Sequence, residues 1–271
     1  MLDQIRVIVS DFDGTLLDDE KRLPEQFPAL LDALEQRNIR FIAASGRQYY
    51  NIRAQLPDGM ADRVDYIAEN GAMTVYHNEI CWVDEIPHAD VKAVVQTIRE
   101  TEGCYPILCG AQCAYFENGD IEEMLFHAGL YYARLKLVPD VLDSISKDTI
   151  CKIAVFHDHD AEHVSYPALL PYADRMQVAL SGECWVDVMN KTINKGAALT
   201  ELLHRMELAP ENCMAFGDYL NDIELLQASG HPYAMENAHP QLKECFPNTT
   251  NADNNHSGVV TTICQELGIE I

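Results

Sequence analysis

The sequence predicts an α/β protein that has a parallel sheet and an inserted α+β domain. Three apolar segments of strand length are each followed by a polar loop and a segment of helical pattern; these strands are expected at residues 5–10, 39–44 and 213–216. Strands that alternate with helices are typical of βαβ units, whose strands run parallel. Between the second and the third of these units the alternation is lost, which predicts a domain of another kind at that place.

Each of the three strands is expected to lead into a helix. The helical patterns lie near residues 25–37, 48–56 and 219–228. A further apolar helix is predicted at 259–267, after a polar loop at 248–256. We therefore expect that loop to be part of the folded structure and not a disordered tail.

The middle of the chain consists of short elements. Residues 72–76 and 80–83 flank a short polar segment, and this pattern predicts an antiparallel hairpin. A helix is expected near 89–100, and short strands near 107–109 and 114–116. Two domains follow from these elements. Residues 1–83 and 189–271 form the parallel α/β domain, and residues 84–188 form the inserted α+β domain.

The composition limits the partners and the compartment. The 271 residues suffice for one large or two small domains, and the net charge of −24 argues against nucleic acid and anionic membranes as partners. No apolar run approaches the roughly 20 residues of a membrane helix, and the first residues lack the pattern of a secretory signal. The nine cysteines are scattered without a Cys-x-x-Cys motif, which favours reduced thiols and a cytoplasmic protein.

The first predicted strand is followed directly by the hexapeptide Asp11-Phe12-Asp13-Gly14-Thr15-Leu16. Two carboxylates thus lie at the carboxyl end of a parallel strand, where ligands of open α/β sheets bind, and Gly14 permits a sharp turn. A divalent metal is the simplest partner for two such acids. The alternatives are an ordinary turn or a calcium loop. An EF-hand would need a glutamate at its twelfth position, which is Arg22 here, so the calcium loop is excluded.

Polar residues also follow the second strand and open a later helix. Ser45 and Gly46 end the second strand, where a hydroxyl group and backbone N–H groups can hold an anionic oxygen. The alternative is a serine that only caps a helix. Lys195 lies in the first turn of a predicted helix, which is unfavourable for the helix dipole unless an anion binds there. A solvated lysine is the alternative.

The fourth group of polar residues lies at the end of another strand, in the segment Gly217-Asp218-Tyr219-Leu220-Asn221-Asp222. Asp218 can complete a hard oxygen site for Mg²⁺ with Asp11. Asn221 and Asp222 lie one helical turn further on and can face the same site. The alternative is that Asp218 only caps the helix.

Together these four segments resemble the motifs of the haloacid dehalogenase superfamily of aspartyl phosphotransferases. The first motif is matched by residues 11–15, and the others by Ser45, by Lys195, and by Asp218 with Asn221 and Asp222. The insertion before the third motif, and Glu69-Asn70-Gly71-Ala72, resemble the Cof-type subfamily, which has a large α/β cap. Three further segments are similar to bacterial sugar phosphatases of that subfamily: residues 44–50, Cys109-Gly110-Ala111-Gln112, and Asp253-Asn254-Asn255-His256.

The resemblance implies a fold and a reaction. The fold is a Rossmann-like three-layer core with a parallel sheet, in which residues 84–188 are a cap that selects the substrate. The reaction is the Mg²⁺-dependent hydrolysis of sugar phosphates and related small monoesters through an aspartyl-phosphate. The implied partner is a small phosphorylated metabolite, and the protein is a monomer or a homodimer.

The resemblance also implies roles for individual residues. Asp11 is the nucleophile, Asp13 is the general acid and base, and Lys195 contributes to catalysis by holding phosphoryl oxygens. Substrate binding is assigned to Ser45, Gly46, Lys195 and Asn221, and Mg²⁺ binding to Asp11, Asp218 and the carbonyl group of Asp13.

Two other functions remain open at this level. A phosphosugar mutase has a similar cap but returns the phosphoryl group to the sugar. A non-catalytic protein that binds a phosphorylated metabolite is the third possibility, although binding alone would not need two carboxylates that face an anion. A separate cluster, with His157, His159 and His163 near two aspartates, suggests metal ligands, but a solvated loop with a helix cap is the favoured interpretation.

Overall fold

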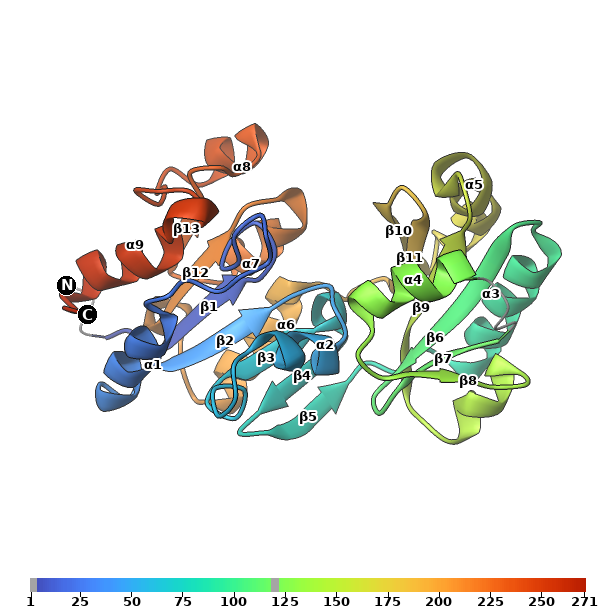
Figure 1. Cartoon of the computed structure of the whole chain (residues 1–271), viewed down its shortest axis with the longest axis horizontal. Helices are drawn as coiled ribbons and strands as arrows, with labels where there is room; N and C mark the ends of the chain where they lie inside the picture. The colour runs from blue at the N-terminus through green and yellow to red at the C-terminus, as the bar shows by residue number, and fades with distance from the viewer. Residues whose placement is uncertain (1–3, 118–121) are drawn as a thin grey trace. The chain divides into compact units, whose positions relative to one another are not determined.

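The computed structural model describes residues 4–117 and 122–271 (Figure 1). The chain divides into two compact units. Met1–Cys81 and Asn194–Ile271 form the first unit, and Trp82–Ile193 forms the second. The chain thus leaves the first unit and returns to it. The boundaries expected from the sequence, at residues 84 and 188, lie a few residues inside these limits.

The first unit is built on a seven-stranded sheet in the order β13-β12-β1-β2-β3-β4-β5. The bounds are β1 (Val7–Asp11), β2 (Arg40–Ala44), β3 (Asp65–Ala68), β4 (Met73–Tyr76), β5 (Glu79–Val83), β12 (Cys213–Gly217) and β13 (His231–Ala234). The strands from β13 to β3 are parallel, and β4 is antiparallel to β3. All residues of β1 are buried, as expected for a parallel strand covered on both faces. The predicted α/β class with a parallel sheet is confirmed.

Helices cover this sheet in two layers. They are α1 (Phe27–Gln36), α2 (Tyr49–Gln55), α6 (Lys195–Arg205), α7 (Ile223–Gln227), α8 (Pro240–Cys245) and α9 (Gly258–Leu267). Helix α1 contacts α9, and α6 contacts α7. The connection from β1 to β2 and the connection from β12 to β13 run in opposite directions along the sheet, so right-handed crossovers place α1 and α7 on opposite faces.

The second unit has a six-stranded sheet in the order β10-β11-β9-β6-β7-β8. The bounds are β6 (Cys104–Gly110), β7 (Ala114–Phe116), β8 (Leu135–Leu137), β9 (Ile150–His157), β10 (Met176–Gly182) and β11 (Trp185–Asn190), with helices α3 (His88–Glu100), α4 (Glu122–Tyr131) and α5 (Tyr166–Leu169). Its neighbouring strands are antiparallel except β7 and β8. Helix α3 buries Val91, Val94 and Ile98 in one apolar cluster, and α4 contributes Met124 and Ala128 to another.

Short helical turns connect these elements. They are η1 (Glu69–Gly71), η2 (Val141–Ser146), η3 (Ala161–Ser165), η4 (Leu170–Tyr172), η5 (Pro210–Asn212), η6 (Leu220–Asp222) and η7 (Asn254–His256). The polar loop predicted at 248–256 contains η7. The helix expected near 219–228 is shorter than predicted, because η6 precedes α7 and the carboxylate of Asp222 accepts the backbone N–H groups of Asp218 and Tyr219.

A hairpin turn and an edge strand complete the sheet of the first unit. β4 and β5 are neighbours in the sheet, and the two residues that join them, His77 and Asn78, both have a positive φ angle, as a type I′ hairpin turn requires. Strand β13 was not predicted, because it is a short edge strand that contains Pro232.

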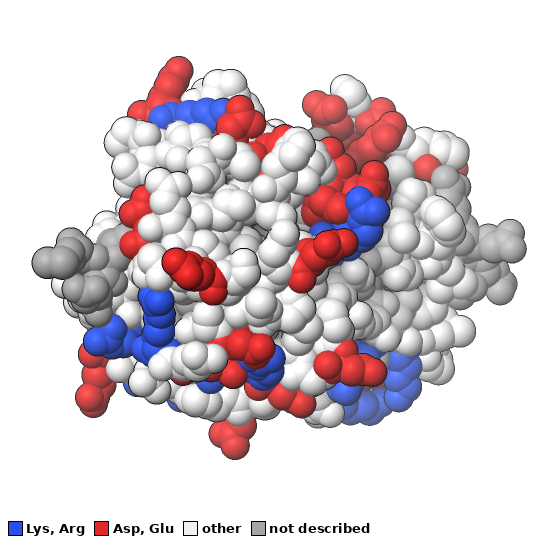
Figure 2. All heavy atoms as spheres, turned by 60° about the vertical axis from the view of Figure 1, so that its left-hand side comes forward, with Lys and Arg blue, Asp and Glu red and all other residues white. Residues whose placement is uncertain are grey.

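On the face shown in Figure 2, basic side chains lie in small groups that adjoin acidic ones. All nine cysteines are free thiols. Within residues 4–117 and 122–271, no helix is both long and apolar enough to span a bilayer.

Candidate active site

The register of the parallel strands brings three predicted site segments to one edge of the sheet. Asp11, the last residue of β1, pairs with Ala44 in β2, so Ser45 follows directly beside it. On the other side Ser10 pairs with Phe216 in β12. The loop that carries Asp218 therefore begins next to the end of β1.

Three carboxylates meet at this edge. Asp11, Asp218 and Asp222 each offer one oxygen, and these oxygens all lie within 4.8 Å of one another. Asp222 is fully buried, and Asp11 is nearly so. Carboxylate oxygens at this spacing suit a hard divalent cation such as Mg²⁺. Asp13, which the sequence analysis assigned to the metal through its carbonyl group, does not contribute its carboxylate to this cluster.

Lys195 supplies a buried positive charge next to the three acids. Its Nζ atom lies 2.5 Å from Oδ1 of Asp11 and 2.7 Å from Oδ1 of Asp222, and its side chain is 2% exposed. The interpretation of Lys195 as a solvated lysine is therefore wrong. It opens α6, whose N-cap residue Asn194 accepts the backbone N–H of Ala197.

The charges of the site are not balanced by Lys195 alone. The pKa of the Asp11 carboxyl group is raised well above its ordinary value, first by burial and then by repulsion from Asp222, and Lys195 offsets only part of this. The pKa of Asp218 is also raised, mainly by burial. Burial disfavours the charged form of Lys195, but Asp11 and Asp222 outweigh it and raise the pKa of Lys195. A further cation would relieve the repulsion among the carboxylates.

Asp13 has different surroundings. Arg47 donates to both of its carboxylate oxygens, from Nε and Nη2, at 2.6 Å each, and Nζ of Lys21 donates at 2.8 Å. Burial alone would raise the pKa of Asp13, but Arg47 and then Lys21 outweigh it, so the pKa is lowered. Asp13 is therefore held as a carboxylate whose orientation is fixed by a bidentate arginine. Sequence reasoning did not find this role of Arg47, although Arg47 directly follows Ser45 and Gly46.

The turn after β1 is fitted closely against Asp218. Gly14 has a φ angle of +76°, and a Cβ atom there would lie 2.6 Å from Oδ2 of Asp218. Thr15 donates from Oγ1 to Oδ1 of Asp218 at 2.7 Å. Thr15 therefore orients the carboxylate of Asp218. Asp218 does not cap the following helix, so that alternative interpretation is wrong.

The loop after β2 is fixed by the turn η1. Oγ of Ser45 accepts the backbone N–H of Arg47 at 3.1 Å, which leaves the hydroxyl proton available for an anion. A Cβ atom on Gly46 would lie 2.8 Å from Oδ1 of Asn70, and one on Gly71 would lie 2.4 Å from the carbonyl oxygen of Asn194. The turn Glu69–Gly71 thus connects the Ser45 loop with the start of α6. Asn221 is exposed at the loop after β12.

The histidines of the second unit do not form a metal site with their aspartates. Oδ1 of Asp160 accepts the backbone N–H of His163 at 3.0 Å and contacts its ring, so that Asp160 caps η3. Elsewhere in the same unit, the backbone N–H groups of Gln112 and Cys113 donate to Asp148, which fixes the turn after β6. Among the described residues, the only group of three or more potential metal ligands is the aspartate cluster of the first unit.

Comparison with known proteins agrees with this geometry. Residues 8–263 match the family model of the haloacid dehalogenase-like hydrolases. The chain is 29% identical over 265 residues to the 5-amino-6-(5-phospho-D-ribitylamino)uracil phosphatase YbjI of Escherichia coli K12, covering 97% of this chain and 96% of the relative. It is 28% identical over 251 residues to the HMP-PP phosphatase of E. coli K12 / DH10B, covering 89% and 88%.

Solved structures show the same fold. The structure of SMU.1108c from Streptococcus mutans has a TM-score of 0.82 and 28% identity, and the match covers 97% of this chain and 99% of the other. TM0651 from Thermotoga maritima has a TM-score of 0.84 and 26% identity, with 96% and 97% coverage.

Proposed function

The chain belongs to the haloacid dehalogenase-like hydrolase family and is a phosphatase of that family, and from this premise we propose that it hydrolyses sugar phosphates and related small monoesters with Mg²⁺. The observation that carries the proposal is the buried cluster of Asp11, Asp218 and Asp222 around Lys195. Such a cluster has no evident use in the core of the fold, because buried carboxylates that repel one another are costly. It is suited to bind a cation and a phosphate together.

The residues fit a divalent metal. Asp11 and Asp218 would hold it with their carboxylates, together with the backbone carbonyl group of Asp13. When bound, Mg²⁺ supplies Lewis acidity and cancels charge between a carboxylate and a phosphate dianion. Lys195 offsets only part of the repulsion, which is the reason to expect this second cation.

The chemistry of the first step falls to Asp11. Its carboxylate oxygen attacks phosphorus, so that an Oδ–P bond forms while the bond from phosphorus to the leaving oxygen breaks. Lys195, which is already in contact with Asp11, stabilises the charge on the phosphoryl oxygens, as do the hydroxyl group of Ser45 and the backbone N–H of Gly46. Asn221 is exposed in the loop after β12, and we assign it a part in substrate binding.

Asp13 transfers the protons. In the first step it gives a proton to the leaving alcohol, and in the second it takes a proton from the water that attacks the aspartyl-phosphate. Arg47 and Lys21 hold Asp13 in its ionised form, which is the form required for the second step. Substrate binding must therefore change these two contacts before Asp13 can act as an acid.

The proposed substrate class is supported by the relatives. Two relatives are named as phosphatases of small phosphorylated metabolites. We assign substrate selection to the inserted unit. We further propose that the protein acts in the cytoplasm, as a monomer or a homodimer. Hydrolysis is preferred over phosphoryl transfer to a sugar because the named relatives release phosphate. A purely binding role is disfavoured by the retention of Asp11, Asp13, Lys195 and Asp218.

The proposal is tested by measuring phosphate release from a panel of phosphorylated sugars and nucleotides. Activity is expected with Mg²⁺, is abolished by a chelator and returns when Mg²⁺ is added back. Full activity in excess chelator would contradict the metal assignment. Isomerised sugar phosphate without free phosphate would identify a mutase.

A further inference from the structure

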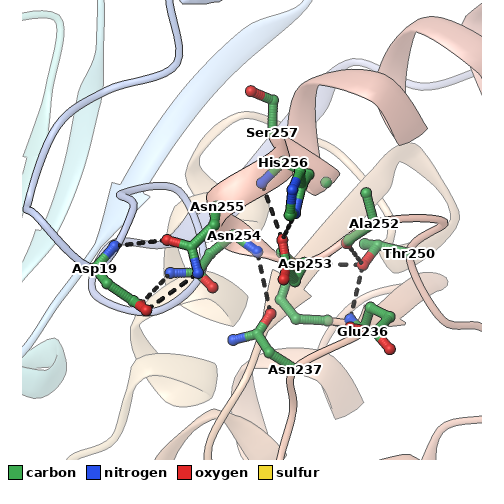
Figure 3. A network of polar contacts seen from close by, with 12 residues as sticks. Asp19, Glu236, Asn237, Thr250, Ala252, Asp253, Asn254, Asn255, His256 and Ser257 are labelled. Atoms are coloured by element: carbon green, nitrogen blue, oxygen red, sulfur yellow. Dashed lines mark hydrogen bonds and ion pairs between the residues drawn. The ribbon is translucent and has the colours of Figure 1, made fainter.

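Three asparagines outside the loop that follows β1 form hydrogen bonds to this loop. Nδ2 of Asn237 donates to the carbonyl oxygen of Gly14 at 2.8 Å. Oδ1 of the same side chain accepts the backbone N–H of Asn254 at 3.2 Å, as Figure 3 shows. Asn237 therefore links the residue next to Asp13 with the turn η7 near the end of the chain.

Two residues of the turn η7 form hydrogen bonds to the far end of the same loop. Asn254 is 4% exposed, and its Nδ2 donates to the carbonyl oxygen of Leu17 at 3.1 Å and to Oδ1 of Asp19 at 3.0 Å. Asn255 makes a reciprocal pair with Asp19 (Figure 3): its Oδ1 accepts the backbone N–H of Asp19, and its Nδ2 donates to Oδ2, each at 3.1 Å.

These contacts bear on the site because the loop carries its reactive groups. The loop begins at Asp13 and Gly14, and it lies close to Asp218, because a Cβ atom on Gly14 would lie 2.6 Å from Oδ2 of Asp218. Thr15, in the same loop, orients the carboxylate of Asp218. A displacement of this loop would thus change both Asp13 and the metal ligands, although none of the three asparagines touches them.

We propose that Asn237, Asn254 and Asn255 form an asparagine clamp that positions the loop of residues 13–19 for phosphoryl transfer. The expected effect of the clamp on turnover rests on the proposed function. The clamp requires amides, since Asn237 and Asn255 each use one donor and one acceptor, and a carboxylate in either place would lose the donor. The asparagines are positioning residues and act through Gly14, Leu17 and Asp19.

Asn255 gives the sharpest test because it is exposed and the fold should tolerate its change. Asn255→Asp places a second carboxylate against Asp19, which should open the clamp. The double variant Asp19→Asn with Asn255→Asp reverses the pair: the new amide at 19 donates to the carboxylate at 255, which still accepts the N–H of residue 19. The amide oxygen at 19 also still accepts from Asn254, so all contacts of Asp19 with η7 are kept.

We expect kcat of Asn255→Asp to fall by roughly tenfold, because the loop carries Thr15, which orients Asp218, and loss of a contact that orients a metal ligand costs about tenfold or more. KM should change little. The double variant, in which the carboxylate and the amide exchange places, should recover most of kcat. Asn251→Asp is the matched control, because Asn251 contacts Gln265 and Thr261 and not the loop. Asn251→Asp should change the midpoint of thermal unfolding without changing kcat. Unchanged kcat in Asn255→Asp, or no recovery in the double variant, would overturn the clamp.

Hydrogen exchange tests the clamp without turnover. Peptides that cover residues 14–22 should exchange faster in Asn255→Asp, and the double variant should restore the wild-type rate. Equal exchange in all three proteins would overturn the inference even if no substrate were turned over. Absence of phosphatase activity in the wild type, with exchange behaving as expected, would instead contradict the proposed function.

Discussion

Lys195 shows at the scale of one residue how stability and chemistry are combined. The buried ammonium contacts Asp11 and Asp222, and its removal would leave their charges without a partner. We expect Lys195→Met to lower the free energy of unfolding by about 3–5 kcal/mol in the presence of a chelator, the range for a buried ion pair that loses one member. Activity should fall by roughly a hundredfold or more. Chemical denaturation and phosphate release measure the two effects.

Lys191→Met is the control for this change. Lys191 is exposed and donates to the backbone carbonyl groups of Ala173 and Asp174. Its replacement should leave both quantities near the wild-type values. Equal stability of the Lys195 and Lys191 variants would show that the buried contacts do not hold the site together.

Variants at Asp11 and Asp13 are predicted to lose different steps of the reaction. Asp11→Asn lacks the nucleophile and should release no phosphate. Asp13→Ala retains the nucleophile, and an aryl phosphate has a good leaving group, so the first step should proceed slowly without an acid. The second step needs a base for water and should stall. Intact mass after an acid quench should then show one phosphoryl group that hydroxylamine removes. Phenol release without an adduct on Asp11 would contradict this division of roles.

At this scale the sequence predicts identities better than contacts. The positions of Asp11, Ser45, Lys195 and Asp218 follow from the ends of predicted elements. The bidentate contact of Arg47 with Asp13 does not, because it depends on the rotamers and on the exact register of two strands. The same holds for Thr15, whose partner Asp218 is 203 residues away in the sequence.

At the scale of elements, the site depends on one close approach between a turn and a helix. Gly71 has a φ angle of +103°, and a Cβ atom there would lie 2.4 Å from the carbonyl oxygen of Asn194, which precedes Lys195. We expect Gly71→Ala to destabilise the protein by about 2–4 kcal/mol, from the left-handed backbone and the overpacking together. Activity should fall as well, because the start of α6 must move.

Gly59→Ala separates these two causes. Gly59 also has a positive φ angle, of +82°, but a Cβ atom there would meet nothing within 4 Å. Its replacement should cost only about 1 kcal/mol and should leave kcat unchanged. If both variants lost activity equally in a folded state, the close approach at Asn194 would not be what positions Lys195.

Strands β1, β2 and β12 of the parallel sheet could be predicted because their apolar runs are continuous and each is followed by a polar loop. The contact of η1 with α6 could not, since it joins segments more than 120 residues apart. The split of the expected helix at 219–228 has a local cause. The carboxylate of Asp222 takes the N–H groups of Asp218 and Tyr219, which a pattern of apolar residues does not reveal.

For the whole molecule, the sequence predicts an insertion because the alternation of strands and helices stops and later resumes. The proposed role of the inserted unit in substrate choice leads to a prediction for Gln112. The turn that carries it is anchored by Asp148, which accepts its backbone N–H. We expect Gln112→Ala to change the ranking of sugar phosphates by kcat/KM and to leave hydrolysis of p-nitrophenyl phosphate nearly unchanged. A uniform loss on every substrate would indicate a folding defect.

The increase in stability that Mg²⁺ gives the whole molecule should depend on pH. The folded-state pKa values of Asp11 and Asp218 are raised, so the metal-free protein is destabilised by these two groups at neutral pH and is relieved of this cost as pH falls through their pKa values. In the proposed site, protons and Mg²⁺ would compete for the same carboxylate oxygens. Stabilisation by Mg²⁺ should therefore be large at pH 7.5 and should shrink toward pH 5.

Thermal unfolding with and without Mg²⁺ at the two pH values measures this coupling. A concentration of roughly 100 times Kd should add about 2.7 kcal/mol at pH 7.5. In Asp218→Asn the increment should be smaller at both pH values, because one charged ligand is lost, and the metal-free protein should be relieved of part of the repulsion at Asp11. An increment that is the same at pH 5 and pH 7.5 would mean that Mg²⁺ binds away from these carboxylates. The cluster of Asp11, Asp218 and Asp222 would then not be the metal site.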